Sequence, residues 1–130
     1  MTDLSGIAMD TPILICNALP FSLVTRKAEI SPVSIEKTVE LMKRYGFESA
    51  WGHQNTLYRV NTLLHMDITP AVRRPLVCLD EDGLPLLNGI SFHRIIVISP
   101  VYARHCRPKI GEEVRESDIK DWHLVLIQFL

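Results

Sequence analysis

The 130-residue sequence contains no long apolar run, only three cysteines and none of the common signatures of metal binding or nucleotide hydrolysis. No stretch approaches the roughly 18–20 apolar residues of a membrane-spanning helix, and the first residues lack the basic-then-apolar pattern of a secretion signal. Cys16, Cys78 and Cys106 form no CxxC pair, which disfavours a disulfide framework and a zinc site. G-x-S-x-G, P-loop and HExxH motifs are absent. We therefore expect a cytoplasmic protein with free thiols, no membrane contact, no metal and no cofactor.

The composition is that of an ordinary globular domain, with 47% hydrophobic and 22% charged residues. The chain is long enough for one core, so we expect a single domain over residues 1–130 with residues 1–11 as a flexible N-terminal extension. The net charge of −1 argues against a long nucleic acid as a partner.

Basic side chains nevertheless concentrate in two short stretches. "RHCRPK" (residues 104–109) carries three cations and His105 without a carboxylate, and "VRRP" contains Arg73 and Arg74. A local basic cluster in a nearly neutral chain suits a small anion better than a polyanion. A solvated basic loop explains the same residues equally well.

The apolar pattern predicts a mixed sheet of about five strands flanked by two principal helices, an α/β or α+β fold. The first helix should begin after Ser34 as its N-cap and end at Gly46, and the second should begin near Asn55. A short helical turn over 116–122 is expected before the last strand. The predicted strands cover residues 13–16, 23–30, 76–79, 93–100 and 123–130.

The segment "GHQNT" opens the second helix and is a candidate anion site. Gly52 permits a tight turn, the free N–H groups of a helix start attract anions, and His53 exchanges a proton near neutral pH. Gln54 could reach a base or a ribose, while Asn55 or Thr56 could cap the helix. The alternative is plain capping by Asn55, with His53 solvated.

The segment "NALPFS" follows the first strand. It places Asn17 and Ser22 just past a carboxyl end of the sheet, where ligands commonly bind in α/β folds. Ordinary turn chemistry is the alternative. Cys16 should belong to the core, and we expect the histidines other than His53 to be structural or on the surface.

Taken together, "NALPFS", "GHQNT" with its following "VNTLL", and "RPKIG" near the end resemble the viral type III anti-CRISPR ring nucleases, small proteins of archaeal viruses and mobile elements. The resemblance covers about residues 12–130. It implies a symmetric homodimer with a mixed sheet, which binds cyclic tetra-adenylate at the dimer interface and cuts it without a metal. It also implies that a ribose 2′ hydroxyl is the nucleophile and that His53 is the general acid. The other positions matching the family's ligand-binding residues are Asn17, Ser22, Arg74 (with Arg73 as a near alternative) and Arg107.

Two departures from the family pattern stand out. Ile110 occupies the position of a glutamate, and Glu112 and Glu113 follow only after the glycine. The stretch over residues 80–92, "DEDGLPLLNG" included, is longer than the usual link and suggests a lid or a specificity element. We therefore expect a ring nuclease of the phosphodiesterase type. The alternatives are a protein that sequesters a cyclic nucleotide without cutting it and an interaction protein of a mobile element.

Overall fold

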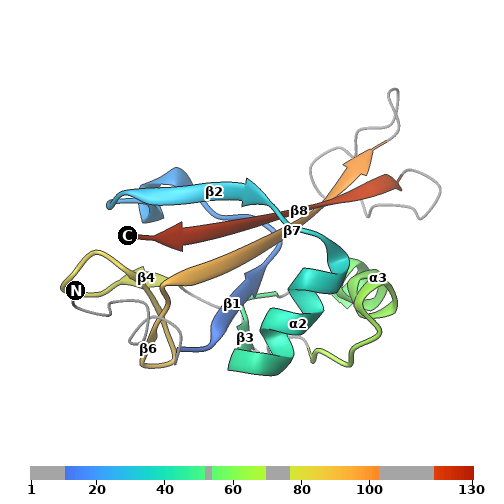
Figure 1. Ribbon diagram of the computed structural model, residues 1–130, viewed down its shortest axis with the longest axis horizontal. Helices are drawn as coiled ribbons and strands as arrows, with labels where there is room; N and C mark the ends of the chain where they lie inside the picture. The colour runs from blue at the N-terminus through green and yellow to red at the C-terminus, as the bar shows by residue number, and fades with distance from the viewer. Residues whose placement is uncertain (1–10, 52–53, 70–76, 103–118) are drawn as a thin grey trace.

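The computed structural model describes residues 11–51, 54–69, 77–102 and 119–130, which form two β-sheets and two α-helices (Figure 1). None of the helices within these ranges is both long and apolar enough to cross a membrane. The elements are β1 (Ile13–Cys16), the 3-10 helix η1 (Phe21–Leu23), β2 (Ala28–Pro32), α2 (Ile35–Tyr45), β3 (Phe47–Ser49), α3 (Gln54–Leu64), β4 (Cys78–Leu79), β5 (Pro85–Leu87), β6 (Ile90–Ser91), β7 (Arg94–Tyr102) and β8 (Ile119–Phe129).

The main sheet has five strands in the order β2-β8-β7-β1-β3. β1 pairs in parallel with both β3 and β7, whereas β8 runs antiparallel to β7 and to β2. This confirms the predicted mixed sheet of five strands and the α+β class. β1 is buried at every position, as expected for a short apolar strand between two neighbours.

The two faces of the main sheet are covered differently. On one face, α2 and α3 pack over alternate sheet residues such as Ile13, Ile15 and Ile96. On the other face, Leu87 and Phe92 pack against the neighbouring sheet positions. Within the described residues, helices therefore cover one face of the main sheet, in agreement with the predicted sheet packed by two principal helices.

The second face is covered by a small antiparallel sheet, β4-β5-β6, made by residues 78–91. Asp80 ties its first turn together, because its carboxylate accepts hydrogen bonds from the N–H groups of Asp82 and Leu84, each at 2.8 Å, and from the Ser91 hydroxyl at 2.6 Å. The Thr25 hydroxyl donates to the Gly83 carbonyl at 2.9 Å. The stretch that suggested a lid is thus a packed layer of the domain.

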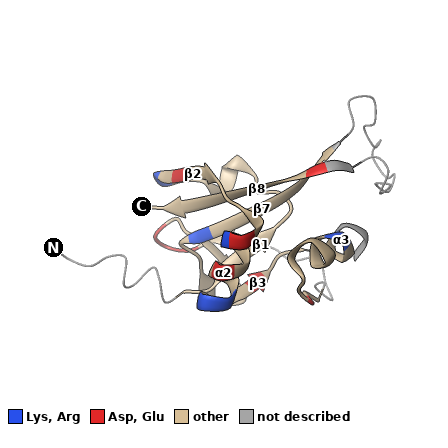
Figure 2. Cartoon of the chain, turned by 45° about the vertical axis from the view of Figure 1, so that its right-hand side comes forward, with Lys and Arg blue, Asp and Glu red and all other residues tan. Residues whose placement is uncertain are grey.

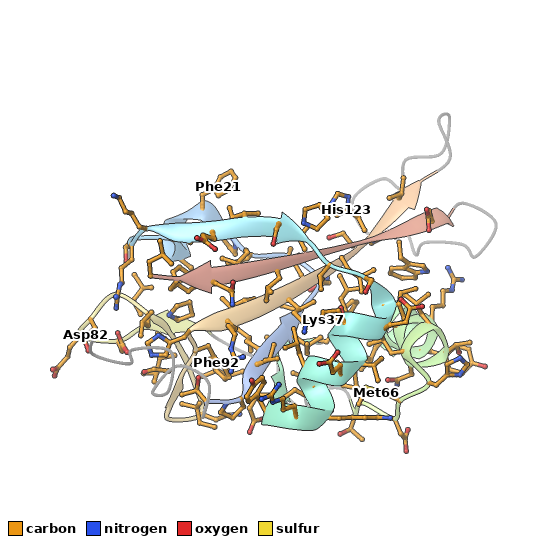
Figure 3. The ribbon with its side chains drawn as sticks, viewed as in Figure 1. Phe21, Lys37, Met66, Asp82, Phe92 and His123 are labelled. Carbon is orange, nitrogen blue, oxygen red and sulfur yellow. The ribbon has the colours of Figure 1, made fainter. Side chains whose placement is uncertain are left out.

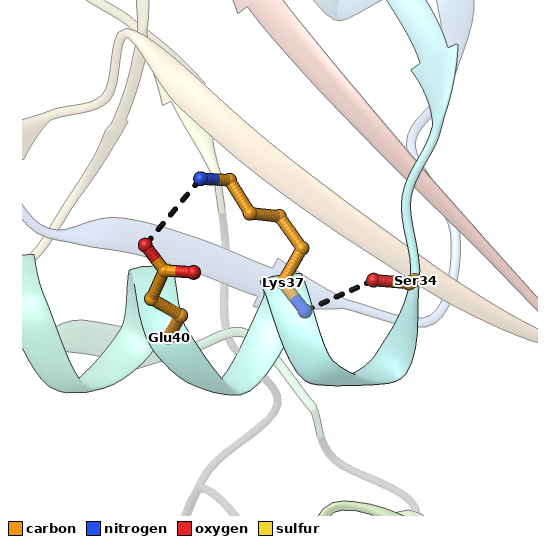
Figure 4. Close-up of polar contacts among 3 residues, drawn as sticks. All are labelled: Ser34, Lys37 and Glu40. Atoms are coloured by element: carbon orange, nitrogen blue, oxygen red, sulfur yellow. Dashed lines mark hydrogen bonds and ion pairs between the residues drawn. The ribbon is translucent and has the colours of Figure 1, made fainter.

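α2 has the ends that its sequence predicts. The Ser34 hydroxyl accepts a hydrogen bond of 3.0 Å from the N–H of Lys37 (Figure 4), and Gly46 follows the last turn with φ of +77°. Lys37 also lies 3.5 Å from a carboxylate oxygen of Glu40, but both side chains are more than half exposed. Such a surface pair contributes little to stability, so the cap and the buried face hold this helix.

Several element predictions were wrong. The strand expected over residues 76–79 belongs to the small sheet and not to the main one. The strand expected over residues 23–30 begins only at Ala28, since η1 and a turn occupy the residues before it. "FESAW" contains β3, which pairs with β1 from Phe47 to Ser49. β8 begins at Ile119, so the described part of 116–122 is strand and not a helical turn. β2, β3 and β8 each pair with a strand that is distant in sequence, and this pairing overrides the conformational preference of the local sequence.

Candidate functional site

The carboxyl ends of the adjacent parallel strands β1 and β3 lie side by side, and β7 runs past the end of β1 to Tyr102; this edge is the candidate site. In register, Ile15 lies beside Ser49 of β3, and Cys16 lies beside Val97 of β7. β1 ends at Cys16, so Asn17 is the first residue beyond it. In open α/β sheets, ligands bind at such an edge. The expected position of Asn17 is confirmed.

Asn17 is held by its main chain. Its carbonyl accepts a hydrogen bond of 3.2 Å from the hydroxyl of Ser99 on β7, whereas its half-buried side-chain amide has no hydrogen-bond partner among the described residues. The sequence analysis missed Ser99. A signal was present, because "SP" interrupts the apolar run of "HRIIVISP".

The chain that leaves β3 is anchored at the same edge. The N–H of Ala50 donates to the Ile15 carbonyl at 2.9 Å, and the N–H of Trp51 donates to the Ser49 hydroxyl at 3.2 Å. The Trp51 side chain has no exposed surface and lies in the core beneath the helices. α3 begins at Gln54, so this edge leads directly to the helix that the sequence placed here.

The helix start differs from the prediction in one respect. α3 already contains Asn55 and Thr56, so neither residue is its N-cap. Gly52 and His53 lie outside the described residues, and the side chains of Gln54 and Thr56 are not described. Arg73, Arg74, Arg107, Ile110, Glu112 and Glu113 also lie outside the described residues.

Ser22 is placed away from α3. It is exposed on η1, whose flanking residues Leu19 and Val24 pack into the core on the face opposite to the helices. Figure 3 shows the neighbouring Phe21 beside β2, pointing outward, while α3 lies on the other side of the main sheet. The structure therefore does not bring Ser22 together with the start of α3.

Cys16 and the described histidines have the placements expected of structural or surface groups, whereas Cys78 is exposed on β4. Cys16 is 3% exposed in the core, and its burial raises the pKa of the thiol to about 12, so it is not a nucleophile at neutral pH. Burial, and secondly the nearby cation of Arg26, lower the pKa of His93. His123 is exposed on β8 (Figure 3). Within the described ranges, no group of three or more His, Cys, Asp or Glu side chains could hold a metal ion.

Arg59 is a further residue that the sequence analysis missed. It is the one basic residue of α3, where Figure 2 shows a blue segment. Its side chain is partly buried, and its Nη1 atom is enclosed without a hydrogen-bond partner. An arginine between the buried Leu57 and Val60 was the signal that could have drawn attention to it.

Comparison with known proteins identifies the fold. No protein-family model matches the chain, and no curated protein does. Among solved structures, the chain is similar to B116 of Sulfolobus turreted icosahedral virus, with a TM-score of 0.55 and 16% sequence identity. The likeness covers 90% of this chain and 98% of B116. The two proteins therefore share a fold over nearly their whole length.

Proposed function

We propose that this protein is a metal-independent ring nuclease, which binds a cyclic oligoadenylate (cyclic tetra-adenylate in the first place) and cleaves it, counteracting type III CRISPR defence. The observation that carries the proposal is that Asn17 and Trp51, which stands three positions before α3 begins at Gln54, follow the carboxyl ends of the adjacent parallel strands β1 and β3. Asn17, the first residue of "NALPFS", follows β1, and Ala50 and Trp51, which precede "GHQNT", follow the neighbouring strand β3. The fold shared with a protein of an archaeal virus supports an origin of this chain in a virus or mobile element.

The proposed reaction is an internal transesterification. A ribose 2′ hydroxyl of the ligand loses its proton to water and attacks the adjacent phosphorus, the bond from phosphorus to the 5′ oxygen breaks, and His53 protonates the departing oxygen. The products are a 2′,3′-cyclic phosphate and a 5′ hydroxyl. Because the ligand supplies its own nucleophile, the reaction requires neither a protein nucleophile nor a metal.

The remaining residues of the proposal bind the ligand. Arg74 and Arg107 clamp phosphate oxygens and stabilise the charge that develops in the transition state. Asn17 offers its amide at the sheet edge, where the side chain is without a partner among the described residues. Ser22 is the weakest member of this set, because η1 lies with the opposite core. Backbone and side-chain contacts from the start of α3 complete the proposed site, at Gly52, Gln54 and Thr56.

A homodimer belongs to the same proposal. A ring with four equal units fits a two-fold dimer, because each protomer contacts one half of the ring with the same residues. The partners are accordingly a cyclic oligonucleotide and a second copy of the chain.

The test is incubation with cyclic tetra-adenylate in the presence of EDTA, followed by product analysis. We expect linear products that end in 2′,3′-cyclic phosphate, formed slowly, and we expect His53→Ala to abolish them while the melting temperature is retained. His65→Ala is the matched control, because His65 is exposed beyond the end of α3. Products that form only when a divalent metal is added would contradict the mechanism.

A sequestering protein is the second candidate, and Ile110 at the position of the family's glutamate favours it. In that case the ligand is recovered intact after binding at stoichiometric protein. A thermal-melt screen over cyclic di-, tri-, tetra- and hexanucleotides separates both candidates from an interaction protein, whose melting temperature no cyclic nucleotide would shift. Tight binding alone does not decide between cutting and storage, since equal binding of ground and transition states leaves the chemical step unchanged.

A further inference from the structure

The strands β7 and β8 extend together past the rest of the main sheet. β1 pairs with β7 only as far as Val97, and the pairing of β2 with β8 begins only at Val125. The parts of β7 and β8 beyond these two residues pair with each other, and Figure 1 shows them projecting past the ends of β1 and β2. A two-stranded ribbon of this kind is stable in water only when an apolar face is packed.

The two faces of this ribbon are covered unequally. On one face, Ile98 is fully buried and Trp122 packs against the core beneath the helices. On the opposite face, burial decreases along β7, from Ile95, which is fully buried, through the half-buried Val97 to Val101, which is 39% exposed. The small sheet therefore covers only the beginning of this face.

β8 shows the same decrease on the same face. Ile127 is 7% exposed, whereas His123 and Asp121, further from the small sheet, are exposed. The register places His123 opposite Ser99 and Asp121 opposite Val101, and residues directly opposite in a sheet share a face. The uncovered end of the face thus combines an apolar side chain with a carboxylate and an imidazole.

The apolar part continues on β2. Ile30 pairs with Ile127, so it lies on the same face, and it is 60% exposed. We call this surface the open face; it consists of Ile30, Pro32, Ser99, Val101, Asp121 and His123. The described strand residues of this face include no Lys or Arg, which argues against a polyanion as its partner. An exposed apolar surface with a few polar groups is typical of a protein contact.

The polar groups of the open face are complementary to each other. One carboxylate oxygen of Asp121 accepts a hydrogen bond of 2.8 Å from the N–H of Trp122, while the His123 ring has no partner among the described residues. A two-fold axis that lies in the interface and crosses β8 at Trp122 places Asp121 opposite His123 of the partner subunit. The symmetry repeats the pair, so both carboxylates receive an imidazole N–H. This charge complementarity favours a second copy of the chain as the partner.

We propose that the open face is the contact surface of a homodimer, in which two copies pack face to face with Val101 in the apolar part and with two pairs between Asp121 and His123. Ser99 on this face donates to the Asn17 carbonyl, so the contact adjoins the candidate site and brings the two sheet edges to one shared space. The inference deepens the homodimer of the proposed function and rests on that function only for the ligand in this space.

The first test is sedimentation velocity of the full chain without ligand, over a series of concentrations. We expect a dimer for the wild type. Val101→Glu brings a charge into the apolar contact and should raise the dissociation constant roughly tenfold or more. Leu79→Glu is the matched control, because Leu79 on β4 is 38% exposed but lies on the small sheet, and it should dimerise as the wild type does. Circular dichroism establishes that each variant is folded.

A charge exchange tests the pairing of Asp121 with His123. His123→Glu sets two carboxylates against each other across the interface and should weaken the dimer. The double variant His123→Glu with Asp121→Lys rebuilds the pair with the opposite sign, and it should recover most of the wild-type affinity. A double variant that dimerises no better than His123→Glu alone would contradict the assigned pairing.

The remaining outcomes separate this inference from the proposed function. A wild type that stays monomeric, or a dimer that neither Val101→Glu nor His123→Glu weakens, overturns the inference. If the wild type dimerises through the open face but neither binds nor cuts cyclic tetra-adenylate, the proposed function fails and the contact surface stands. If it cuts cyclic tetra-adenylate while Val101→Glu leaves the dimer intact, the contact surface is wrong and the proposed function stands.

Discussion

The hydroxyl of Ser99 donates a hydrogen bond of 3.2 Å to the main-chain carbonyl of Asn17, 82 positions earlier in the chain. The bond joins β7 to the first residue beyond β1, where the strand pairing ends. It holds the backbone of Asn17 while leaving the side-chain amide available. The geometry of the candidate site therefore depends on a residue from the neighbouring strand.

We expect Ser99→Ala to lower the free energy of unfolding by about 1 kcal/mol, the usual net value of one hydrogen bond. Urea denaturation measures the loss. Ser31→Ala on the outer strand β2 is the control, because that residue is exposed and its side chain makes no hydrogen bond in the described structure. Equal stability of the two variants would mean that the bond between β7 and Asn17 contributes nothing.

The turn after α3 depends on Asn61. Its amide nitrogen donates to the Ile68 carbonyl at 2.9 Å, and its amide oxygen accepts from the Ile68 N–H at 2.8 Å. Asn61→Ala should cost about 1–3 kcal/mol, because both main-chain groups of a buried residue lose their partner. Thr62→Ala, which removes only a 3.2 Å bond within the exposed face of the helix, should cost clearly less by the same denaturation measurement.

A substitution of Phe92 tests whether the small sheet is a structural layer of the domain. The Phe92 side chain is completely buried, so Phe92→Ala should cost about 3–5 kcal/mol. Leu79→Ala, at a residue of β4 that is 38% exposed, should cost well under half of that. A mild effect of Phe92→Ala would restore the interpretation of this segment as a lid.

The hydrogen bonds of the Asp80 carboxylate lead us to expect that the protein loses stability in acid. The Ser91 hydroxyl and then the N–H of Leu84 hold the pKa of its carboxyl below the usual 3.8. The unfolded chain therefore binds the proton more readily, and stability rises with pH through this window. The contribution is fully present above pH 3.8 and is lost as the pH falls through the folded-state pKa.

Unfolding free energies measured between pH 2.5 and 6 test this dependence. Asp80→Asn should lose stability relative to the wild type above pH 4, and the difference should narrow as the pH falls. Asp82→Asn removes a charge from the same turn without touching the hydrogen bonds of the Asp80 carboxylate, and it should retain the acid dependence of the wild type. A constant difference between Asp80→Asn and the wild type across this range would contradict the assignment.

The candidate site was predictable only in part. Asn17 could be placed, because a short apolar run followed by turn formers marks the end of a buried strand. Ser22 was grouped with it from proximity in sequence, yet η1 carries it to the opposite face of the sheet. Ser99 and Arg59 were not predicted, because they stand out only by the hydrogen bonds that their side-chain atoms form or lack in the folded chain.

Local chemistry in the sequence was enough to determine β1, the body and caps of α2, the apolar face of α3 and most of β7. Apolar spacing and capping act between residues a few positions apart, so they are readable without the fold. Only the tertiary structure decided that "FESAW" contains a strand, that β8 begins at Ile119 and that residues 78–91 form a second sheet. These elements exist because a distant strand supplies hydrogen bonds or an apolar face. The enclosed Nη1 atom of Arg59 belongs with them, since burial is a property of the folded chain.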